Sequence, residues 1–150
     1  MSVRLTMSRT LPGPPEVVWD LITDWENQGD WMLEATDFQV TSPMREGVGV
    51  EAVATVRIGG LRTRDAIRVI AWDPPRLLGI QHMGWVKGVA EVRLTRLENG
   101  STRADWTEEL HPPLGLLGDI GVRLFKPIMV RVFSRDLRVL EGLVRARSRS

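Results

Sequence analysis

The sequence predicts an α+β fold in which a curved, seven-stranded antiparallel sheet wraps around one long C-terminal helix, with two short helices after strand one. Three observations predict it. Seven stretches have the character of strands, mostly with apolar and polar residues in alternation. A helical pattern of apolar residues occupies residues 114–146, and the length of 150 residues fits one domain. Such a helix laid across a curved sheet tends to leave a space between the two.

The N-terminal part predicts one strand and two short helices. Residues 3–10 alternate apolar and polar side chains, as a half-buried strand does. A proline-rich break follows, and proline is well tolerated at a helix start because the first N–H groups have no partner within the helix. A helix is predicted over residues 16–22. The capping-box spacing of Thr23 and Glu26 predicts a second short helix that runs to about Trp31.

Six further strands are predicted between this helix and the long one. Gly59-Gly60 and Asn99-Gly100 are typical of tight hairpin turns, and pairs of prolines end two other strands. These strands are expected to form an antiparallel meander. The predicted strands are residues 37–42, 50–58, 62–72, 77–83, 87–97 and 102–110.

The long helix is predicted in two parts. Residues 114–125 are apolar nearly all round, whereas the later part has one apolar stripe. Its arginines are expected to form a solvated face that pairs partly with Asp136 and Glu141. The domain is predicted to span residues 1–146, with residues 147–150 as a disordered tail. The apolar stripe consists of Met129, Phe133, Leu137, Leu140 and Val144.

Composition excludes several classes of function. The chain has no cysteine, so it has no disulfide, thiolate nucleophile or cysteine-bound zinc. Two isolated histidines predict no metal cluster, and the sequence has no phosphate-binding loop or nucleophile elbow. We therefore expect no metal and no cofactor. The net charge of +1 predicts no nucleic-acid partner.

The sequence also suggests where the protein resides. The first ten residues lack the apolar run of a signal peptide. Charged residues and a proline interrupt the longest apolar stretch, residues 114–132, which predicts that it does not span a bilayer. We expect a cytoplasmic protein. The basic residues are nearly all arginine and tyrosine is absent, which suits a GC-rich bacterial genome.

Four segments together resemble the START/Bet v 1-like (SRPBCC) superfamily, and within it the polyketide cyclase/dehydrase and lipid-transport group. They are PPEVVWDLITDW at 14–25, Gly-x-Gly at 47–49, Trp-Asp-Pro-Pro at 72–75 and the strand at 102–109. The resemblance covers almost the whole chain and implies a helix-grip fold. It also implies an internal site for lipids, polyketides, sterols or other hydrophobic molecules. Fold resemblance alone does not choose between binding and catalysis.

The candidate ligand-binding residues lie on the inner face of the predicted sheet, on the second short helix and on the long helix. Small inward residues such as Ala54, Gly88 and Ala90 leave room for a ligand, and tryptophan offers a large apolar face. Core packing is the alternative role for each of them. The candidates are Trp25, Trp31, Ala54, Val56, Ile67, Val69, Ile80, His82, Trp85, Ala90, Val92, Trp106, Glu108, Leu117, Ile120, Leu124 and Met129.

Four residues are candidates for catalysis. Strict alternation places Glu108 inward, where a carboxylate would bind a ligand's polar end or act as a general base, and Asp65 follows the same argument. His82 titrates near neutral pH and can transfer a proton, although a lone inward histidine is more often a core residue. In the cyclases that the chain resembles, an arginine contacts polyketide oxygens. Arg57 is its nearest match, although alternation places Arg57 outward.

The leading hypothesis is that the protein binds a small hydrophobic or amphipathic molecule, such as a lipid, polyketide or aromatic compound, in a cavity between sheet and C-terminal helix. One alternative is a cyclase or dehydratase that uses a pocket carboxylate or histidine. The cyclases it resembles also use pocket tyrosines, which this chain lacks. A second alternative is a lipid chaperone or protein-interaction module. Membrane contact is less favoured, and the protein is expected to be a monomer or homodimer.

Overall fold

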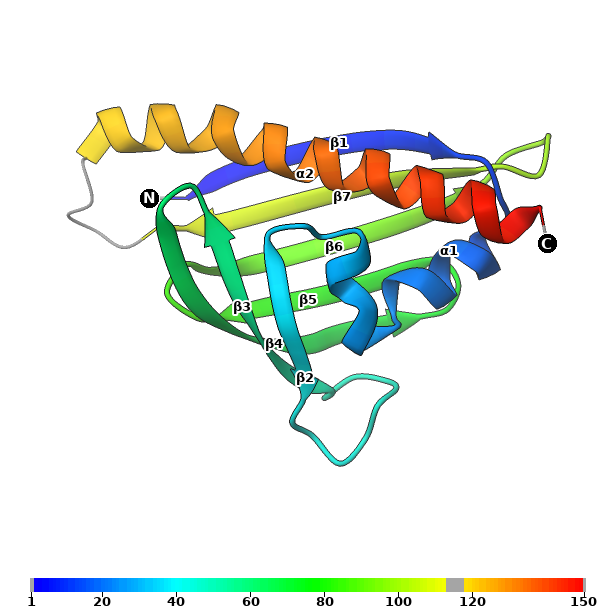
Figure 1. Cartoon of the computed structure of the whole chain (residues 1–150), viewed down its shortest axis with the longest axis horizontal. Helices are drawn as coiled ribbons and strands as arrows, with labels where there is room; N and C mark the ends of the chain where they lie inside the picture. The colour runs from blue at the N-terminus through cyan, green and yellow to red at the C-terminus, as the bar shows by residue number, and fades with distance from the viewer. Residues whose placement is uncertain (1, 113–117, 150) are drawn as a thin grey trace.

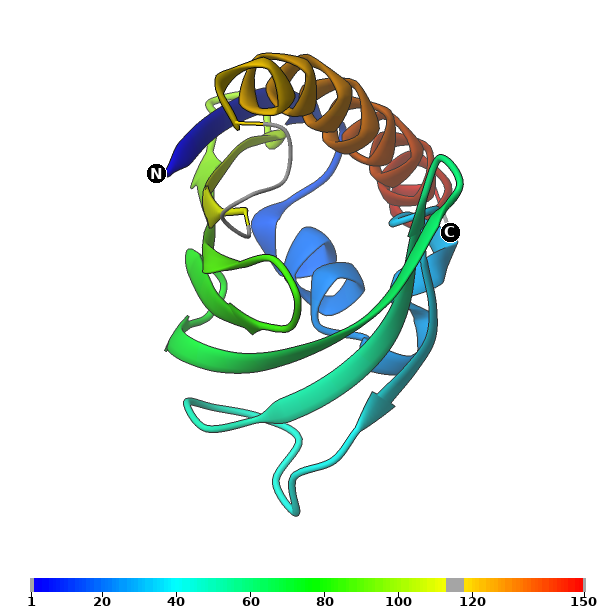
Figure 2. The ribbon, with the colours of Figure 1, turned by 90° about the vertical axis from the view of Figure 1, so that its left-hand side faces the viewer.

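The computed structural model describes residues 2–112 and 118–149, and for residues 118–123 it describes the backbone alone. It confirms the predicted fold class: seven antiparallel strands form one curved sheet, and a long helix lies across its concave face (Figures 1 and 2). The elements are β1 (Val3–Leu11), α1 (Pro15–Ile22), η1 (Trp25–Asp30), β2 (Ala35–Val40), β3 (Glu51–Ile58), β4 (Leu61–Asp73), β5 (Leu77–Met83), β6 (Lys87–Arg96), β7 (Thr102–His111) and α2 (Gly118–Ser148).

The sheet has the strand order β1-β7-β6-β5-β4-β3-β2. Strands β2 to β7 form the predicted meander, and β1 joins it by pairing with β7. Register shifts interrupt β2 between Thr36 and Gln39 and β4 between Val69 and Ala71. Such irregularities increase the local twist of a sheet, and this sheet curls around α1, which lies within its concave side (Figure 2).

The segment between β1 and β2 differs from its prediction in one detail. Thr23 does not cap the second short helix: its hydroxyl donates to the carbonyl of Trp19 at the end of α1. The second short helix therefore begins at Trp25, and it is a 3-10 helix of six residues. Tight i to i+3 turns of this length are typical connectors, and this one places Trp25 and Gln28 in the interior.

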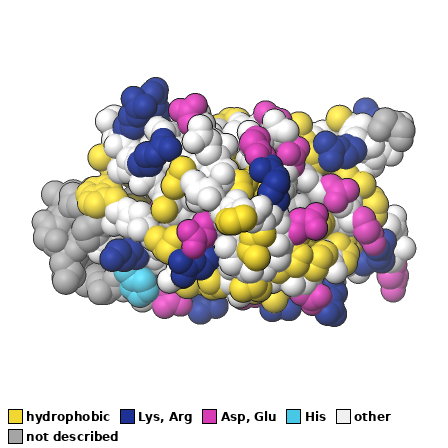
Figure 3. Space-filling model, turned by 90° about the horizontal axis from the view of Figure 1, so that it is seen from below, with side chains coloured by type: hydrophobic (Ala, Val, Ile, Leu, Met, Phe, Trp, Pro, Cys, Tyr) yellow, Lys and Arg dark blue, Asp and Glu magenta, His cyan; other side chains and the backbone are white. Residues whose placement is uncertain are grey.

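The later part of α2 carries the core as predicted. All five residues of its apolar stripe, from Met129 to Val144, are buried, and the helix contacts β1 and α1. The helix ends at Ser148, two residues beyond the predicted domain limit. On the face seen in Figure 3, charged side chains of both signs are mixed with hydrophobic ones.

Candidate functional site

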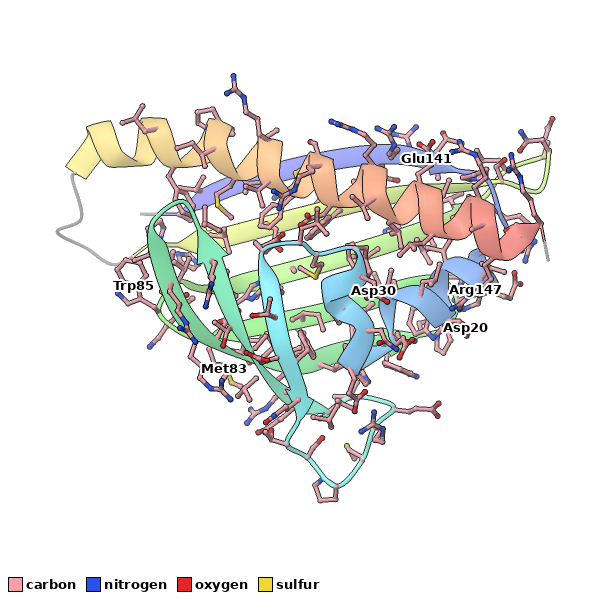
Figure 4. All side chains as sticks on the ribbon, in the orientation of Figure 1. Asp20, Asp30, Met83, Trp85, Glu141 and Arg147 are labelled. Atoms are coloured by element: carbon pink, nitrogen blue, oxygen red, sulfur yellow. The ribbon has the colours of Figure 1, made fainter. Side chains whose placement is uncertain are left out.

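A pocket of about 270 Å³ lies between the sheet and α2 at the end of the molecule that carries the β3–β4 hairpin. Figure 4 shows Trp85 at this end. Leu61, Trp85 and Ile128 line the pocket and are each 43–50% exposed, so they mark its mouth. Seventeen described residues line the pocket, and twelve of them are apolar: Met32, Ala35, Val56, Ile58, Leu61, Trp85, Val86, Leu110, Phe125, Ile128, Met129 and Phe133.

The pocket's polar side is a row of three side chains from three strands. His82 Nδ1 lies 3.1 Å from Asp65 Oδ2, and His82 Nε2 lies 3.1 Å from Glu108 Oε2. The indole N–H of Trp106 donates to the other oxygen of Glu108 at 3.1 Å. Glu108 is 2% exposed, so its charge is almost fully removed from water. The three acid–base candidates named from the sequence therefore form one hydrogen-bonded group.

The row crosses β6 because that strand has almost no side chains there. His82 on β5 pairs with Gly88, and Glu108 on β7 pairs with Ala90. A Cβ at position 88 would lie 2.0 Å from the Glu109 carbonyl oxygen, so only glycine fits. These small residues let side chains from β5 and β7 meet above β6. The sequence prediction that they leave room for a ligand was incomplete, because here they leave room for the His82–Glu108 contact.

Histidine 82 carries a positive charge at neutral pH. Burial alone lowers its pKa, but hydrogen bonds and charges from Asp65 and Glu108 outweigh burial and raise the pKa of His82 to about 10. The geometry agrees, because both ring nitrogens face carboxylate oxygens and only the imidazolium donates from both. The arrangement is an ion-pair row, and the described part of the chain holds no group of side chains arranged to bind a metal ion.

A second buried acidic pair lies beside the pocket. Glu34, between η1 and β2, lines the pocket at 6% exposure, and Asp136 on α2 is fully buried. Burial is the main cause that raises the pKa of Glu34 to about 9, and the adjacent Asp136 carboxyl adds to it. Arg135 donates to Glu34 at 3.3 Å and to Asp136 at 3.4 Å. The pair thus retains one proton at neutral pH, which bridges the two carboxyl groups.

This finding corrects the predicted solvated face of α2. Asp136 does not belong to that face, since it points into the interior, where the Leu33 backbone N–H donates to it at 3.3 Å. Glu141 behaves as predicted, because it pairs with Arg145 at 2.8 Å as well as with Arg9. The signal for Asp136 was its position, three residues after Phe133 and four before Leu140, on the apolar stripe.

Replacing Glu34 with glutamine is expected to flatten the pH dependence of the free energy of unfolding between pH 6 and 8. The folded pKa of Glu34 lies above its unfolded value, so the folded chain holds a proton that the unfolded chain has lost. Stability then falls as pH rises from about 4.5 towards 9, by at most about 1.4 kcal/mol per pH unit. Urea unfolding at pH 6, 7 and 8 measures how steeply the free energy of unfolding falls with pH. An unchanged slope in Glu34→Gln would contradict the shared proton, and exposed Glu46→Gln is the control.

Five of the seventeen predicted ligand-binding residues line the pocket: Val56, His82, Trp85, Glu108 and Met129. Asp65 lines it as well, whereas Arg57 is exposed on the outer face of β3. Leu117 and the side chain of Ile120 lie outside the described residues. The predicted residues that do not line the pocket are Trp25, Trp31, Ala54, Ile67, Val69, Ile80, Ala90, Val92, Trp106 and Leu124.

Aromatic packing explains three of these differences, those at Trp25, Trp31 and Trp106. Trp25 stacks on Phe38 and lies beside Trp72. These three rings together fill the part of the concave face next to α1. Trp106 packs on Phe133 with ring centroids 4.7 Å apart and contacts Trp31 edge-on. Trp31 and Trp106 therefore form a second layer behind the pocket wall. Leu124 is 58% exposed on the outside of α2.

Sequence reasoning missed eleven lining residues. Ile58 and Thr63 extend the inward alternation of Val56 and Asp65 towards the hairpin, so the signal was present. Phe133 belongs to the predicted apolar stripe, from which only Met129 was a candidate ligand-binding residue. The missed residues are Met32, Glu34, Ala35, Ile58, Leu61, Thr63, Val86, Leu110, Phe125, Ile128 and Phe133.

Comparison with known proteins agrees with this architecture. The family model described as polyketide cyclase/dehydrase and lipid transport matches residues 2–146. The uncharacterized protein Rv1546 of Mycobacterium tuberculosis is 29% identical over 128 residues, which cover 81% of this chain and 80% of that protein.

Solved structures share the fold at low sequence identity. The Zhui aromatase/cyclase from Streptomyces sp. R1128 superposes with a TM-score of 0.85 at 17% identity, covering 98% of this chain and 96% of that one. A START superfamily protein from Mycobacterium smegmatis gives 0.81 at 15% identity, covering 95% and 97%. These identities show the fold alone. In the part of the chain that the structure describes, none of the helices has the length and apolarity needed to cross a membrane.

Proposed function

Since the chain belongs to the polyketide cyclase/dehydrase and lipid-transport family, we propose that it binds a small hydrophobic or amphipathic molecule in the pocket beneath α2. The observation that carries this proposal is the pocket's lining, apolar on most sides with one row of polar groups on the sheet. Burial of apolar ligand surface, at about 25 cal/mol per Å², supplies affinity. The polar row orients the ligand.

The pocket's volume limits the size of the ligand. An apolar protein cavity of about 150 Å³ accommodates benzene, and typical ligand pockets begin at about 300 Å³. At about 270 Å³, this pocket suits one or two fused rings or a short chain. A long-chain lipid would extend through the mouth past Trp85.

Naphthalene is a suitable probe of this proposal. In a ¹⁵N NMR titration, the indole N–H signal of Trp85, which lines the pocket, is expected to shift with saturation at one site. The indole signals of Trp19 and Trp72 serve as internal controls. These two rings pack on each other with centroids 5.1 Å apart, and neither residue lines the pocket. Absence of saturable shifts at Trp85 would contradict the proposal.

The row of Asp65, His82 and Glu108 favours a second candidate function, proton transfer to or from a bound ligand. An imidazolium held between two carboxylates can pass a proton from one carboxylate to the other, and acid–base groups of this kind typically contribute about 10²–10⁴-fold to a rate. A ketone bound with its acidic C–H beside the row would lose a proton to a carboxylate and regain one from solvent.

Deuterium exchange tests this second function. The C–H groups next to the carbonyl of 2-tetralone are expected to exchange faster in D₂O with the protein present. Glu108→Gln should slow this exchange by at least about 100-fold, whereas Arg57→Ala, on the outer face of β3, should leave it unchanged. Equal exchange with Glu108→Gln, with Asp65→Asn and with the unmodified chain would exclude acid–base use of the row.

A further inference from the structure

We propose that the pocket selects ligands whose polar group donates a hydrogen bond, as a hydroxyl or an ammonium does, and excludes ligands that end in a carboxylate. This inference rests on the proposed binding function and names the ligand class. Its basis is the chemistry of the five polar residues that line the pocket: Glu34, Thr63, Asp65, His82 and Glu108. Asp65 and Glu108 belong to the polar row, Glu34 keeps its proton at neutral pH, and no lysine or arginine occurs among the described lining residues.

His82 is the sole cationic side chain among the described lining residues, and it is already engaged. Both ring nitrogens lie 3.1 Å from carboxylate oxygens, one of Asp65 and one of Glu108. An imidazolium has two N–H donors, so none remains for a ligand anion. Arg135 on α2 binds Asp136 and the lining residue Glu34, and its side chain is 43% exposed.

The row instead offers hydrogen-bond acceptors. Asp65 uses one oxygen towards His82, and its side chain is 20% exposed at the pocket. Each carboxylate oxygen accepts more than one hydrogen bond, so Asp65 retains capacity for a ligand donor. Glu108 is further satisfied by Trp106, which makes Asp65 the more available acceptor. Two carboxylates and one imidazolium leave one net negative charge in this row.

A ligand carboxylate would therefore meet three unfavourable conditions at once. It would lose its hydration among twelve apolar side chains, find no free cationic donor among the described lining residues, and lie beside the negative charge of the row. A hydroxyl or ammonium group at the same place would donate to Asp65, and hydrogen bonds to charged groups are stronger than those between neutral groups. The pocket thus distinguishes donors from anions.

Four ligands with the same ring system test this selection at pH 7: naphthalene, 2-naphthol, 2-naphthylmethylamine (an ammonium) and 2-naphthoate. We expect 2-naphthol, the ammonium or both to bind at least about tenfold more tightly than naphthalene. We expect 2-naphthoate to bind at least about tenfold more weakly than naphthalene. Comparing the affinities of 2-naphthol and the ammonium shows whether the pocket prefers a neutral or a cationic donor. Dissociation constants come from the shift of the Trp85 indole signal.

Variants assign the selection to Asp65. Asp65→Asn, which replaces the carboxylate with an amide that donates as well as accepts, should reduce the affinity ratio of 2-naphthol to 2-naphthoate by at least about tenfold. Asp105→Asn makes the same change on the outer face of β7, where Asp105 binds Ser8 and Arg103, and should leave the ratio unchanged.

The possible results separate the two proposals. If 2-naphthoate bound as tightly as 2-naphthol and the ammonium, or if Asp65→Asn left the ratio unchanged, this inference would be overturned while naphthalene binding still supported the proposed function. If none of the four ligands bound, the proposed function would fail and the selection with it. Tight binding of naphthalene and a donor ligand, with weak binding of 2-naphthoate, supports both.

Discussion

Replacing His82 with leucine is expected to lower the free energy of unfolding by about 3–5 kcal/mol, the usual cost when one partner of a buried ion pair is removed. Without His82, the carboxylate of Glu108, at 2% exposure, keeps only the hydrogen bond from Trp106. Urea unfolding at pH 7 measures the loss. Gln81→Leu, an exposed neighbour on the same strand, is the control and should change stability by less than about 0.5 kcal/mol.

Two additional measurements separate the ion pair from simple packing. The folded pKa of His82 is about 10, above its unfolded value, so its contribution is fully present below about pH 6.5 and is lost as pH rises through 10. The stability difference between the native chain and His82→Leu should narrow over this range. The double variant His82→Leu/Glu108→Leu should recover at least about half of the loss. A loss below about 1 kcal/mol in the single variant would contradict the buried row.

Replacing Val56 with tryptophan is expected to weaken naphthalene binding by at least about 100-fold. Val56 lines the pocket from β3, and an indole there would occupy space that the ligand needs. Filling an existing hollow avoids the strain of overpacking, so the free energy of unfolding should change by less than about 1 kcal/mol. The NMR titration with naphthalene measures affinity, and urea unfolding measures stability.

The neighbouring position supplies the control for this variant. Arg57→Trp places the same indole on the opposite, exposed face of β3, where it should leave naphthalene affinity unchanged. Undiminished binding by Val56→Trp would place the ligand elsewhere on the protein. A loss of stability of several kcal/mol would indicate that the space around Val56 is already filled.

Local sequence patterns predicted the fold well because each element has a clear period. The alternation in β3 placed Val56 inward and Arg57 outward, as the structure does. The helical spacing from Met129 to Val144 identified the buried stripe of α2. The same alternation placed Glu108 and His82 inward. These inferences depend on residues close together in the chain, where turn signals and periodicity fix the register.

The site itself depends on contacts between strands, which local patterns do not contain. The sequence predicted three separate acid–base candidates, but the contacts of His82 with Asp65 and with Glu108 span 17 and 26 positions. The contact with Asp65 joins the neighbouring strands β4 and β5, whereas the contact with Glu108 forms because Gly88 and Ala90 leave the surface of β6 open. Glu34 was missed for a similar reason, since its partner Asp136 lies 102 positions later on α2.

The extent of the pocket was also outside the reach of pattern reading. Alternation does not separate inward residues that line a cavity from those that fill the core, and Trp25, Trp31 and Trp106 fill much of the concave face with ring contacts. How far a side chain of that size reaches depends on its rotamer and neighbours. The pocket therefore occupies only the end of the sheet near the β3–β4 hairpin.

Ligand binding as proposed here requires an apolar hollow beneath α2 beside Phe133. Diffraction from crystals pressurised with xenon tests it most directly, since xenon occupies dry apolar cavities without needing a polar partner. We expect a xenon atom in contact with Val56, Met129 and Phe133 in the native chain and its loss in Val56→Trp. An interior without xenon, with α2 packed directly against the sheet at these residues, would contradict it.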